Sequence, residues 1–520
     1  MSLFRSSIIV SALSVVVSGV SFLNQLVLAN YFGAGEAMDL YLLASSIPLM
    51  CAGLISAGLS YSLIPHLVIM QSTLGGEYKA YLGYFIKQYN VYLFILCLTG
   101  SIISVFAIPF LYSNLSMLEI EEARIIALMA WLCFVGTANQ AVVICVLNAK
   151  KEFFKPLLLS FVLYSSSICI TVLFYDDLGI ISVALGVLLG TALTLTWGIY
   201  LIRGDFEWQF LGNGFKSVIT KYLRQLQFAM VAMLTFTVYQ SIDAFWAPKL
   251  GASNLSYLGY SSRMLIAFGA LIITGPSAVL VPRLTISLHE NREIDFFKDV
   301  ILVIKLVLSL SSVFAVIFIV LGHPITKILF ERGAFSPEDT VGLSGIFPFM
   351  FSGMVFMVGV VILFRVLFLR ESSAKLAILG TVGSVSYFLL SGIFSEFWGL
   401  EGIAFAYLCT WILLFSIGLH LLFKNNVQYL NDKSTLLFVL KQCTALLLVY
   451  LTVVQSYSML SLDVYENNFY QLVTNTLISS SLGVIVFFLV SLRIIKHAEI
   501  IYLVAELKRL ICYSQKRGAQ

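Results

Sequence analysis

The chain has 520 residues, of which 60% are hydrophobic and 11% are charged. Soluble globular domains have about 25% charged residues, so this composition excludes a cytosolic enzyme, a secreted disulfide scaffold and a receptor with one membrane anchor. Outer-membrane barrels are not favoured either, because their strands alternate polar and apolar residues. The composition predicts an all-α, polytopic membrane protein.

Fourteen apolar runs are bounded by charged or turn residues and are long enough to cross a membrane as helices. They cover residues 8–30, 39–70, 84–112, 123–148, 155–175, 179–202, 219–248, 255–286, 299–322, 341–369, 374–395, 400–423, 435–456 and 470–492. The first run is too long for the apolar part of a cleaved signal peptide, so we interpret it as a retained helix. The second and eighth runs are long enough to tilt, or to break at Gly58 and at Gly275-Pro276.

The basic residues provide a separate test of this count. If the N-terminus is cytoplasmic and fourteen helices follow, 26 of the 31 Lys and Arg residues lie on the cytoplasmic side. Arg124, Lys249, Lys327 and Arg332 lie outside, and Arg263 stays in the membrane. Cytoplasmic loops carry an excess of Lys and Arg, and one helix more or fewer would scramble every later loop. The charge pattern therefore predicts a multi-pass protein with both termini in the cytoplasm, and it offers no basic face to a nucleic acid.

Motifs for soluble chemistry are absent from the sequence. The eight cysteines are scattered without a CxxC pair, and we interpret them as small hydrophobic side chains of the helices. There is no Walker A loop, no dinucleotide glycine fingerprint and no metal spacing of histidines. We therefore expect no ATP hydrolysis, no catalytic residue, no bound metal and no cofactor.

An internal repeat relates two parts of the chain. Residues 32–35 open the second helix and residues 63–67 lie at its end, and the similar stretches 250–253 and 280–284 open and end the eighth helix about 217 residues later. A repeat unit of six helices has an even number of crossings, so both copies enter the membrane in the same direction. The repeat predicts two parallel six-helix lobes around a central cavity, with two extra C-terminal helices. The predicted divisions are an N-terminal lobe 1–203, a cytoplasmic linker 204–218, a C-terminal lobe 219–424, helices 13 and 14 at 425–495, and a cytoplasmic tail 496–520.

Ionisable residues inside the predicted helices mark a candidate site, because a charge in the membrane tends to face a cavity or a partner. Arg263 lies about nine residues, or roughly 13 Å, into the run 255–286. Asp243 lies near the outer end of its helix, and the repeat places it opposite Gln25. Asp39 lies at the outer start of the second helix, and Asn24 lies in the first. We expect these residues to form a sparse polar lining of the cavity's outer half.

Simpler interpretations of the same residues exist. Arg263 and Asp243 would also suit a structural ion pair between neighbouring helices, and Asp39 would suit an acidic first helical turn. We favour Arg263 as the substrate-binding residue, because a guanidinium binds phosphate well in a site of low dielectric constant.

The outer loop 324–340 has a distinct pattern. It begins as a short amphipathic helix at Pro324, turns at Gly333, and restarts with Ser336 as N-cap and Pro337 at the first helical position. This pattern predicts a helix at the membrane interface.

At these residues the sequence resembles the MurJ/MviN family of lipid II flippases, within the multidrug/oligosaccharidyl-lipid/polysaccharide exporter superfamily. The resemblance extends from the first helix to about the twelfth. Four stretches carry it: Ala29–Gly35 with Asp39; Leu147–Ala149 with Phe153 and Pro156; Tyr260–Met264 with Val281-Pro282; and, most specifically, Leu329–Phe335 with Asp339-Thr340.

The resemblance implies a flippase of the bacterial inner membrane that moves a polyprenyl-diphosphate-linked glycan from the cytoplasmic to the outer leaflet by alternating access. Its partners would be that glycan, membrane lipids and glycan-assembly enzymes. The family's cavity is cationic, which suits a diphosphate. Coupling to a proton gradient, a sodium gradient or the membrane potential would be consistent with it, and Asp243 is the candidate residue for a coupling ion.

This chain departs from the family pattern at several cavity positions. Ser18, Asn24 and Ala52 stand where the family has arginines, and Ile266 replaces an acidic residue, so Arg263 alone remains of that cluster. We therefore expect a capsule or exopolysaccharide precursor as cargo, with lipid II as the alternative cargo. A cation-coupled small-molecule exporter and a polyprenyl-phosphate glycosyltransferase or polymerase are the alternative functions.

Overall fold

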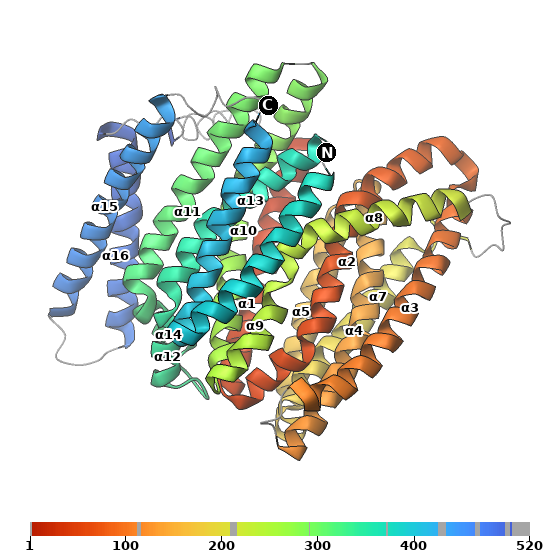
Figure 1. The fold of residues 1–520 in the computed structure, drawn as a ribbon, viewed down its shortest axis with the longest axis horizontal. Coiled ribbons are helices and arrows are strands. Elements are labelled where there is room, and N and C mark those ends of the chain that lie inside the picture. Colours follow the sequence, from red (N-terminus) through yellow and green to blue (C-terminus); the bar gives the residue numbers. More distant parts are fainter. Residues whose placement is uncertain are drawn as a thin grey trace. The chain divides into compact units, whose positions relative to one another are not determined.

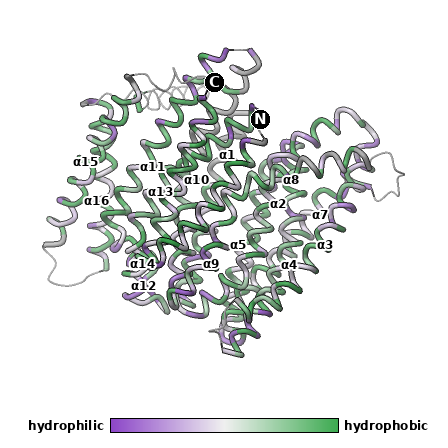
Figure 2. Tube along the Cα trace, in the orientation of Figure 1, coloured by the Kyte–Doolittle hydropathy of each residue, from purple (hydrophilic) through white to green (hydrophobic). Residues whose placement is uncertain are grey.

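A computed structural model describes residues 3–111, 116–207, 216–290, 292–370, 373–424, 433–462, 469–494 and 500–501. Throughout this part of the chain the regular elements are helices, as the all-α prediction requires (Figure 1). Hydrophobic residues run along the helices and hydrophilic ones gather toward their ends (Figure 2). Of the predicted linker, residues 208–215 lie outside the described residues, and so does the predicted tail apart from residues 500–501.

Eleven of the described helices are long and apolar enough to cross a membrane, and one bent pair, Leu226–Thr237 with Tyr239–Leu250, forms a twelfth span. Two of the eleven are far longer than one crossing needs: Glu36–Phe110 has 75 residues and Lys375–Phe423 has 49. The first is interrupted by a short 3₁₀ turn at Gly75–Glu77, and the second by a non-helical residue, Gly399. Counting each of these two as a pair of crossings gives the fourteen spans expected from the sequence.

The chain folds as two compact units. Unit 1 comprises Met1–Arg263, Arg332–Asp339 and Ser373–Ile403. Its helices are α1 (Leu3–Phe32), α2 (Glu36–Leu74), η1 (Gly75–Glu77), α3 (Tyr78–Leu111), α4 (Met117–Ala149), α5 (Phe154–Leu173), α6 (Tyr175–Leu178), α7 (Ile181–Ile202), α8 (Lys216–Thr237), α9 (Tyr239–Trp246), η3 (Ala247–Leu250) and the start of α10 (Asn254–His289). It also contains the first part of α14 (Ser373–Phe423).

The core of unit 1 forms where α2, α3, α4 and α8 pack together around large buried side chains such as Tyr81, Phe85, Phe134 and Tyr222. Small residues allow other helices to approach closely. A Cβ on Gly186 of α7 would lie 2.8 Å from the carbonyl oxygen of Ser167 in α5, so a side chain there would separate the two helices.

Unit 2 comprises Met264–Glu331, Thr340–Ser372 and Ala404–Gln520. It contains the rest of α10, α11 (Glu293–Phe330), most of α12 (Pro337–Gly345), α13 (Phe347–Leu369), the end of α14, α15 (Lys433–Leu462), α16 (Phe469–Leu489) and η5 (Val490–Ile494). The last two long helices pair with each other and pack on α11 through an apolar cluster. The division into predicted lobes at 1–203 and 219–424 stays a prediction.

Several helix boundaries differ from the expected ones. The run 219–248 is not one helix, because α8 and α9 meet at Val238 with a bend of 51°. No break occurs in α2 at Gly58 or in the backbone of α10 at residues 275–276. The helix expected at 299–322 continues to Phe330 after a kink at Leu321, and it includes the predicted start of the outer loop at Pro324.

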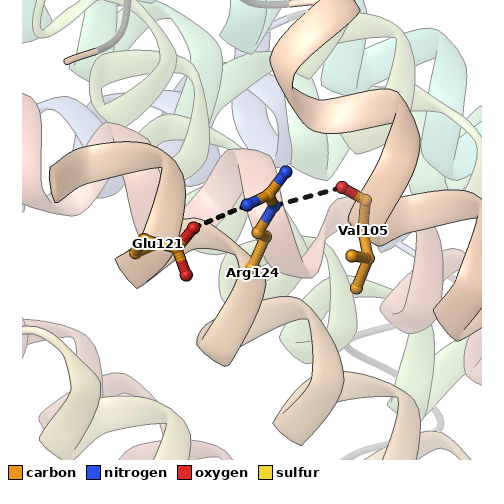
Figure 3. Close-up of polar contacts among 3 residues, drawn as sticks. All are labelled: Val105, Glu121 and Arg124. Atoms are coloured by element: carbon orange, nitrogen blue, oxygen red, sulfur yellow. Dashed lines mark hydrogen bonds and ion pairs between the residues drawn. The ribbon is translucent and has the colours of Figure 1, made fainter. Parts of the chain in front are cut away.

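An arginine completes the end of α3. Pro109 has no backbone N–H, so it leaves the carbonyl of Val105, four residues earlier, without its helical donor. The Arg124 Nε of α4 donates a hydrogen bond to that carbonyl oxygen at 3.3 Å, and its Nη1 lies 2.5 Å from the Glu121 carboxylate (Figure 3). One of the four basic residues expected outside therefore stabilises the helix pair α3–α4.

Candidate functional site

Two glycine turns of unit 1 interlock at the end of α1. Gly33, between α1 and α2, and Gly333, in the loop before α12, have φ values of +62° and +59°. A Cβ on Gly33 would overlap the Ala334 carbonyl, and one on Gly333 would overlap the Asn30 carbonyl. The Ala334 N–H donates to that Asn30 carbonyl at 2.8 Å. Only glycine, which tolerates positive φ and has no Cβ, permits this approach.

Asp39 connects the same turn to α10. The backbone N–H and the hydroxyl of Ser256 both donate to Asp39 Oδ1, at 2.7 and 2.5 Å. Ser256 is the third residue of α10, so its N–H is one of the donors that a helix start leaves without an internal partner. The carboxylate of α2 thus caps a different helix, and both side chains are buried. The expected acidic first turn of α2 is present, but its Asp39 side chain caps the start of α10.

Two tyrosines of α10 complete the contact. The Tyr260 hydroxyl donates to the Gly33 carbonyl at 2.7 Å, and the Tyr257 hydroxyl donates to Asp339 Oδ1 at 2.9 Å. Asp339 and Ser336 also cap α12 reciprocally, each accepting the other's backbone N–H on its side chain. This confirms the N-cap predicted at Ser336. We call residues 30–39, 254–260 and 332–339 together the outer junction.

Arg263 lies one turn beyond Tyr260 on α10 and is exposed. Within the described part of the chain, Arg263 forms no ion pair, so the alternative of a structural pair with Asp243 is not realised there.

Asp243 of α9 has a different partner. It is buried, and the Tyr387 hydroxyl of α14 donates to its Oδ1 at 2.5 Å. One turn further along, Trp246 Nε1 donates to the Phe388 carbonyl at 3.1 Å. These bonds hold α9 against α14. Across the described residues, no three His, Cys, Asp or Glu side chains are grouped as a metal site.

The remaining predicted site residues lie in α1. Asn24 is buried, and its Oδ1 has no hydrogen-bond partner among the described residues, whereas Gln25 is half-buried. Contacts do not join the five predicted residues into one cluster in the described structure; Asp39 and Asp243 each contact a residue outside the predicted set. Ser256, Tyr257 and Tyr387 were not predicted, because a serine or tyrosine in an apolar helix gives no signal of its partner.

Unit 2 contains an apolar groove of about 550 Å³ between α10, α11 and α16. Its walls include Phe268, Phe314 and Phe318 on one side and Val473 and Leu477 on the other. The groove offers a surface for a hydrocarbon chain rather than for a sugar.

The helical spans and their pairing define a polytopic α-helical membrane protein with a transporter fold. A solved structure described as "Lipid II flippase MurJ, inward closed conformation" superposes with a TM-score of 0.76 over 94% of this chain and 99% of that one, at 21% identity. An inward-facing multidrug resistance MATE family transporter of the MOP superfamily superposes with a TM-score of 0.56 over 79% of this chain and 99% of its own, at 15% identity.

The family model for the lipid II flippase MurJ matches residues 28–478. A probable lipid II flippase MurJ of Vibrio cholerae is 24% identical over 78% of this chain and 80% of its own length. A Helicobacter pylori protein of the same description is 23% identical over 63% of this chain and 75% of its own. The chain belongs to the MurJ family of lipid II flippases, which confirms the resemblance, and it is a multi-pass protein of the bacterial inner membrane.

Proposed function

We propose that this chain moves a polyprenyl-diphosphate-linked glycan from the cytoplasmic to the outer leaflet by alternating access. The outer junction carries the proposal. It joins the α1–α2 turn of the predicted N-terminal lobe to α10 and to the loop before α12, both in the predicted C-terminal lobe, through four hydrogen bonds. Such bonds can be exchanged for water when two lobes rock apart, so the junction suits a gate on the release side.

Arg263 supplies the cation for the cargo's phosphates. It is exposed, it follows the outer junction on α10, and no acidic group among the described residues neutralises it. A guanidinium donates paired hydrogen bonds to phosphate oxygens, and these strengthen where water is scarce. In this proposal Asp39 closes the gate, and Asn24 and Gln25 contribute polar groups on α1.

The polyprenyl chain and the diphosphate-linked glycan of the cargo need different surfaces on the protein. The groove of unit 2 provides apolar surface of the kind that a polyprenyl chain needs. The described relatives carry the name lipid II flippase. However, the buried Ala52 and the serine and asparagine at positions 18 and 24 leave fewer cations than the family pattern has, which favours a capsule or exopolysaccharide precursor.

Transport in liposomes tests the proposal. Purified protein should move a fluorescent polyprenyl-diphosphate glycan between leaflets without consuming a sugar nucleotide. Arg263→Ala should reduce the rate at least ten-fold, because the phosphates then lose their cation, while Arg263→Lys should retain part of it. Normal transport by Arg263→Ala would remove the site assignment, and turnover of a sugar nucleotide would favour the transferase alternative. Competition between unlabelled lipid II and a capsule-type precursor then identifies the cargo.

A further inference from the structure

A second contact between the predicted lobes lies at the opposite end of α2, in the half that the orientation prediction places toward the cytoplasm. The Tyr222 hydroxyl of α8 is 2.9 Å from Ser62 Oγ of α2. The Tyr222 ring stacks on the His66 ring with centroids 4.5 Å apart, and His66 Nε2 is 2.6 Å from the Tyr81 hydroxyl. Tyr222 is only 2% exposed, so this tyrosine is enclosed by the helices that it joins.

Small residues of α2 bring the two helices together beside this contact. A Cβ on Gly58 would lie 2.9 Å from the Cγ of Met230 and 3.5 Å from its backbone nitrogen. A Cβ on Gly53 would lie 3.2 Å from the Cγ2 of Thr237. The backbones of α2 and α8 therefore approach each other closely at Gly58, whereas at Gly53 and Ser62 α2 meets the side chains of Thr237 and Tyr222.

Where the structure describes the side chains of α8, those that pack on α2 lie on one face. Ile219, Tyr222 and Leu226 are buried against α2 and its neighbours, whereas Gln227 and Phe228 on the other side are exposed. A Cβ on Gly380 of α14 would overlap the carbonyl oxygen of Val231, so α8 also packs on α14 near its C-terminal end. The segment of α8 before Val231 can separate from α2 without disrupting its own backbone hydrogen bonds.

The bend at Val238 also favours such a movement. Sharp bends in helices usually arise at proline or glycine, and residues 234–239 contain neither. On either side of the 51° bend the helices are packed: α8 on α2 and on Gly380 of α14, and α9 on α14 through Asp243 and Tyr387. Thr237 Oγ1 donates to the Met233 carbonyl at 3.2 Å, a bond that loosens a helix at this point. Release of α8 would allow the span to straighten.

We propose that Ser62, His66 and Tyr222 form an inner latch, which pins α8 to α2 and must open before the cargo's headgroup enters from the cytoplasm. This inference rests on the proposed alternating access. The outer junction is closed in the same structure, so entry requires the inner contact to separate. Tyr222 is thus a positioning residue that controls loading, and the glycan itself does not touch it.

A reversible disulfide tests the latch. In a cysteine-free background, Gly58→Cys with Met230→Cys joins α2 to α8 where their backbones are within disulfide reach. The matched control, Val143→Cys with Gly198→Cys, joins α4 to α7 inside the predicted N-terminal lobe, where the Gly198 Cβ would lie 3.6 Å from the Val143 Cβ. Oxidation should slow glycan transport at least ten-fold in the first pair only, and reduction should restore it. Unchanged transport by the oxidised first pair would overturn the latch.

Spin-label distances test the latch without any cargo. Labels at Ser72 and Val218, exposed on α2 and α8, should show two distances in liposomes, while labels at Ser72 and Tyr200 should show one. Tyr222→Phe should shift the first pair toward the longer distance. Tyr89→Phe, which loses a phenol hydrogen bond of the same 2.9 Å length to the Ala138 carbonyl, should not. A single distance for Ser72 and Val218 would refute the latch, whereas two distances with no lipid transport would retain it and refute the proposed cargo.

Discussion

Asp39 and Arg124 both satisfy a backbone atom that helix geometry leaves without a partner. Asp39 accepts the N–H of Ser256 at the start of α10, and Arg124 donates to the Val105 carbonyl that Pro109 leaves free. An N–H or carbonyl left unpaired at a helix end is costly where water is scarce, and a charged side chain gains from pairing with it. Charged residues near the helix ends therefore contribute to the fold.

The bond between Asp39 and Ser256 predicts a measurable coupling. Asp39→Asn should destabilise the purified protein by about 1–3 kcal/mol, because hydrogen bonds to a charged group contribute about that much. Ser256→Ala should destabilise the protein less. A double-mutant cycle followed by thermal unfolding should show that the effects of the two changes on stability are not additive. Glu36→Gln changes an exposed acid in the same helical turn and serves as the control. Additive effects would mean that the bond does not hold the outer junction.

The elements that matter most for the proposed transport are not ideal helices. The seventh apolar run, residues 219–248, is broken into α8 and α9, and α11 kinks at Leu321 before it reaches the outer loop. The turns at Gly33 and Gly333 require positive φ. These irregular positions let one element contact two neighbours, which a straight helix of the same length could not do.

The glycine interlock predicts an effect of Gly33→Ala beyond ordinary backbone strain. A residue with a side chain at positive φ costs about 1–2 kcal/mol. Gly75→Ala, at φ +52° with no atom within 4 Å of the added Cβ, incurs that strain alone. Gly33→Ala additionally collides with the Ala334 carbonyl, so it should open the outer junction. A cysteine placed at the buried Ala34 should then react faster with maleimide, and equal rates in both variants would contradict the interlock.

At the scale of the whole molecule, the charge pattern and the spans together predict the orientation. With the N-terminus in the cytoplasm, the turn between α2 and α3 lies inside and the turn between α9 and α10 lies outside. The orientation also decides which compartment the proposed inner latch faces, because it determines which end of α2 lies toward the cytoplasm.

Labelling of intact cells tests that orientation. In the cysteine-free background, Lys249→Cys should react with a maleimide that cannot cross the membrane. Glu77→Cys should react only after permeabilisation. Both positions are exposed, so a failure to react reflects the compartment rather than burial. The reverse pattern would invert the topology and would place the outer junction on the loading side.

Composition and hydropathy were sufficient to predict the class of protein and its membrane-spanning runs, because these depend on local runs of residues. The family was indicated by four short motifs and not by composition. Composition and hydropathy also indicated Asp39, Asp243 and Arg263 as charges that need an explanation. They did not predict the partners. Ser256 is 217 positions from Asp39, and Tyr387 is 144 positions from Asp243. A spacing of that size gives no periodic signal in the sequence.

The tertiary structure alone decided how the charges are used. It paired Asp39 with the start of α10 and left Arg263 exposed. It also bent the run 219–248 between α8 and α9, where the sequence has neither proline nor glycine. The physical reason is that a chain's apolar pattern determines which segments leave water, whereas the pairing of the polar groups carried with them depends on which helices pack together. That packing is a property of the folded molecule.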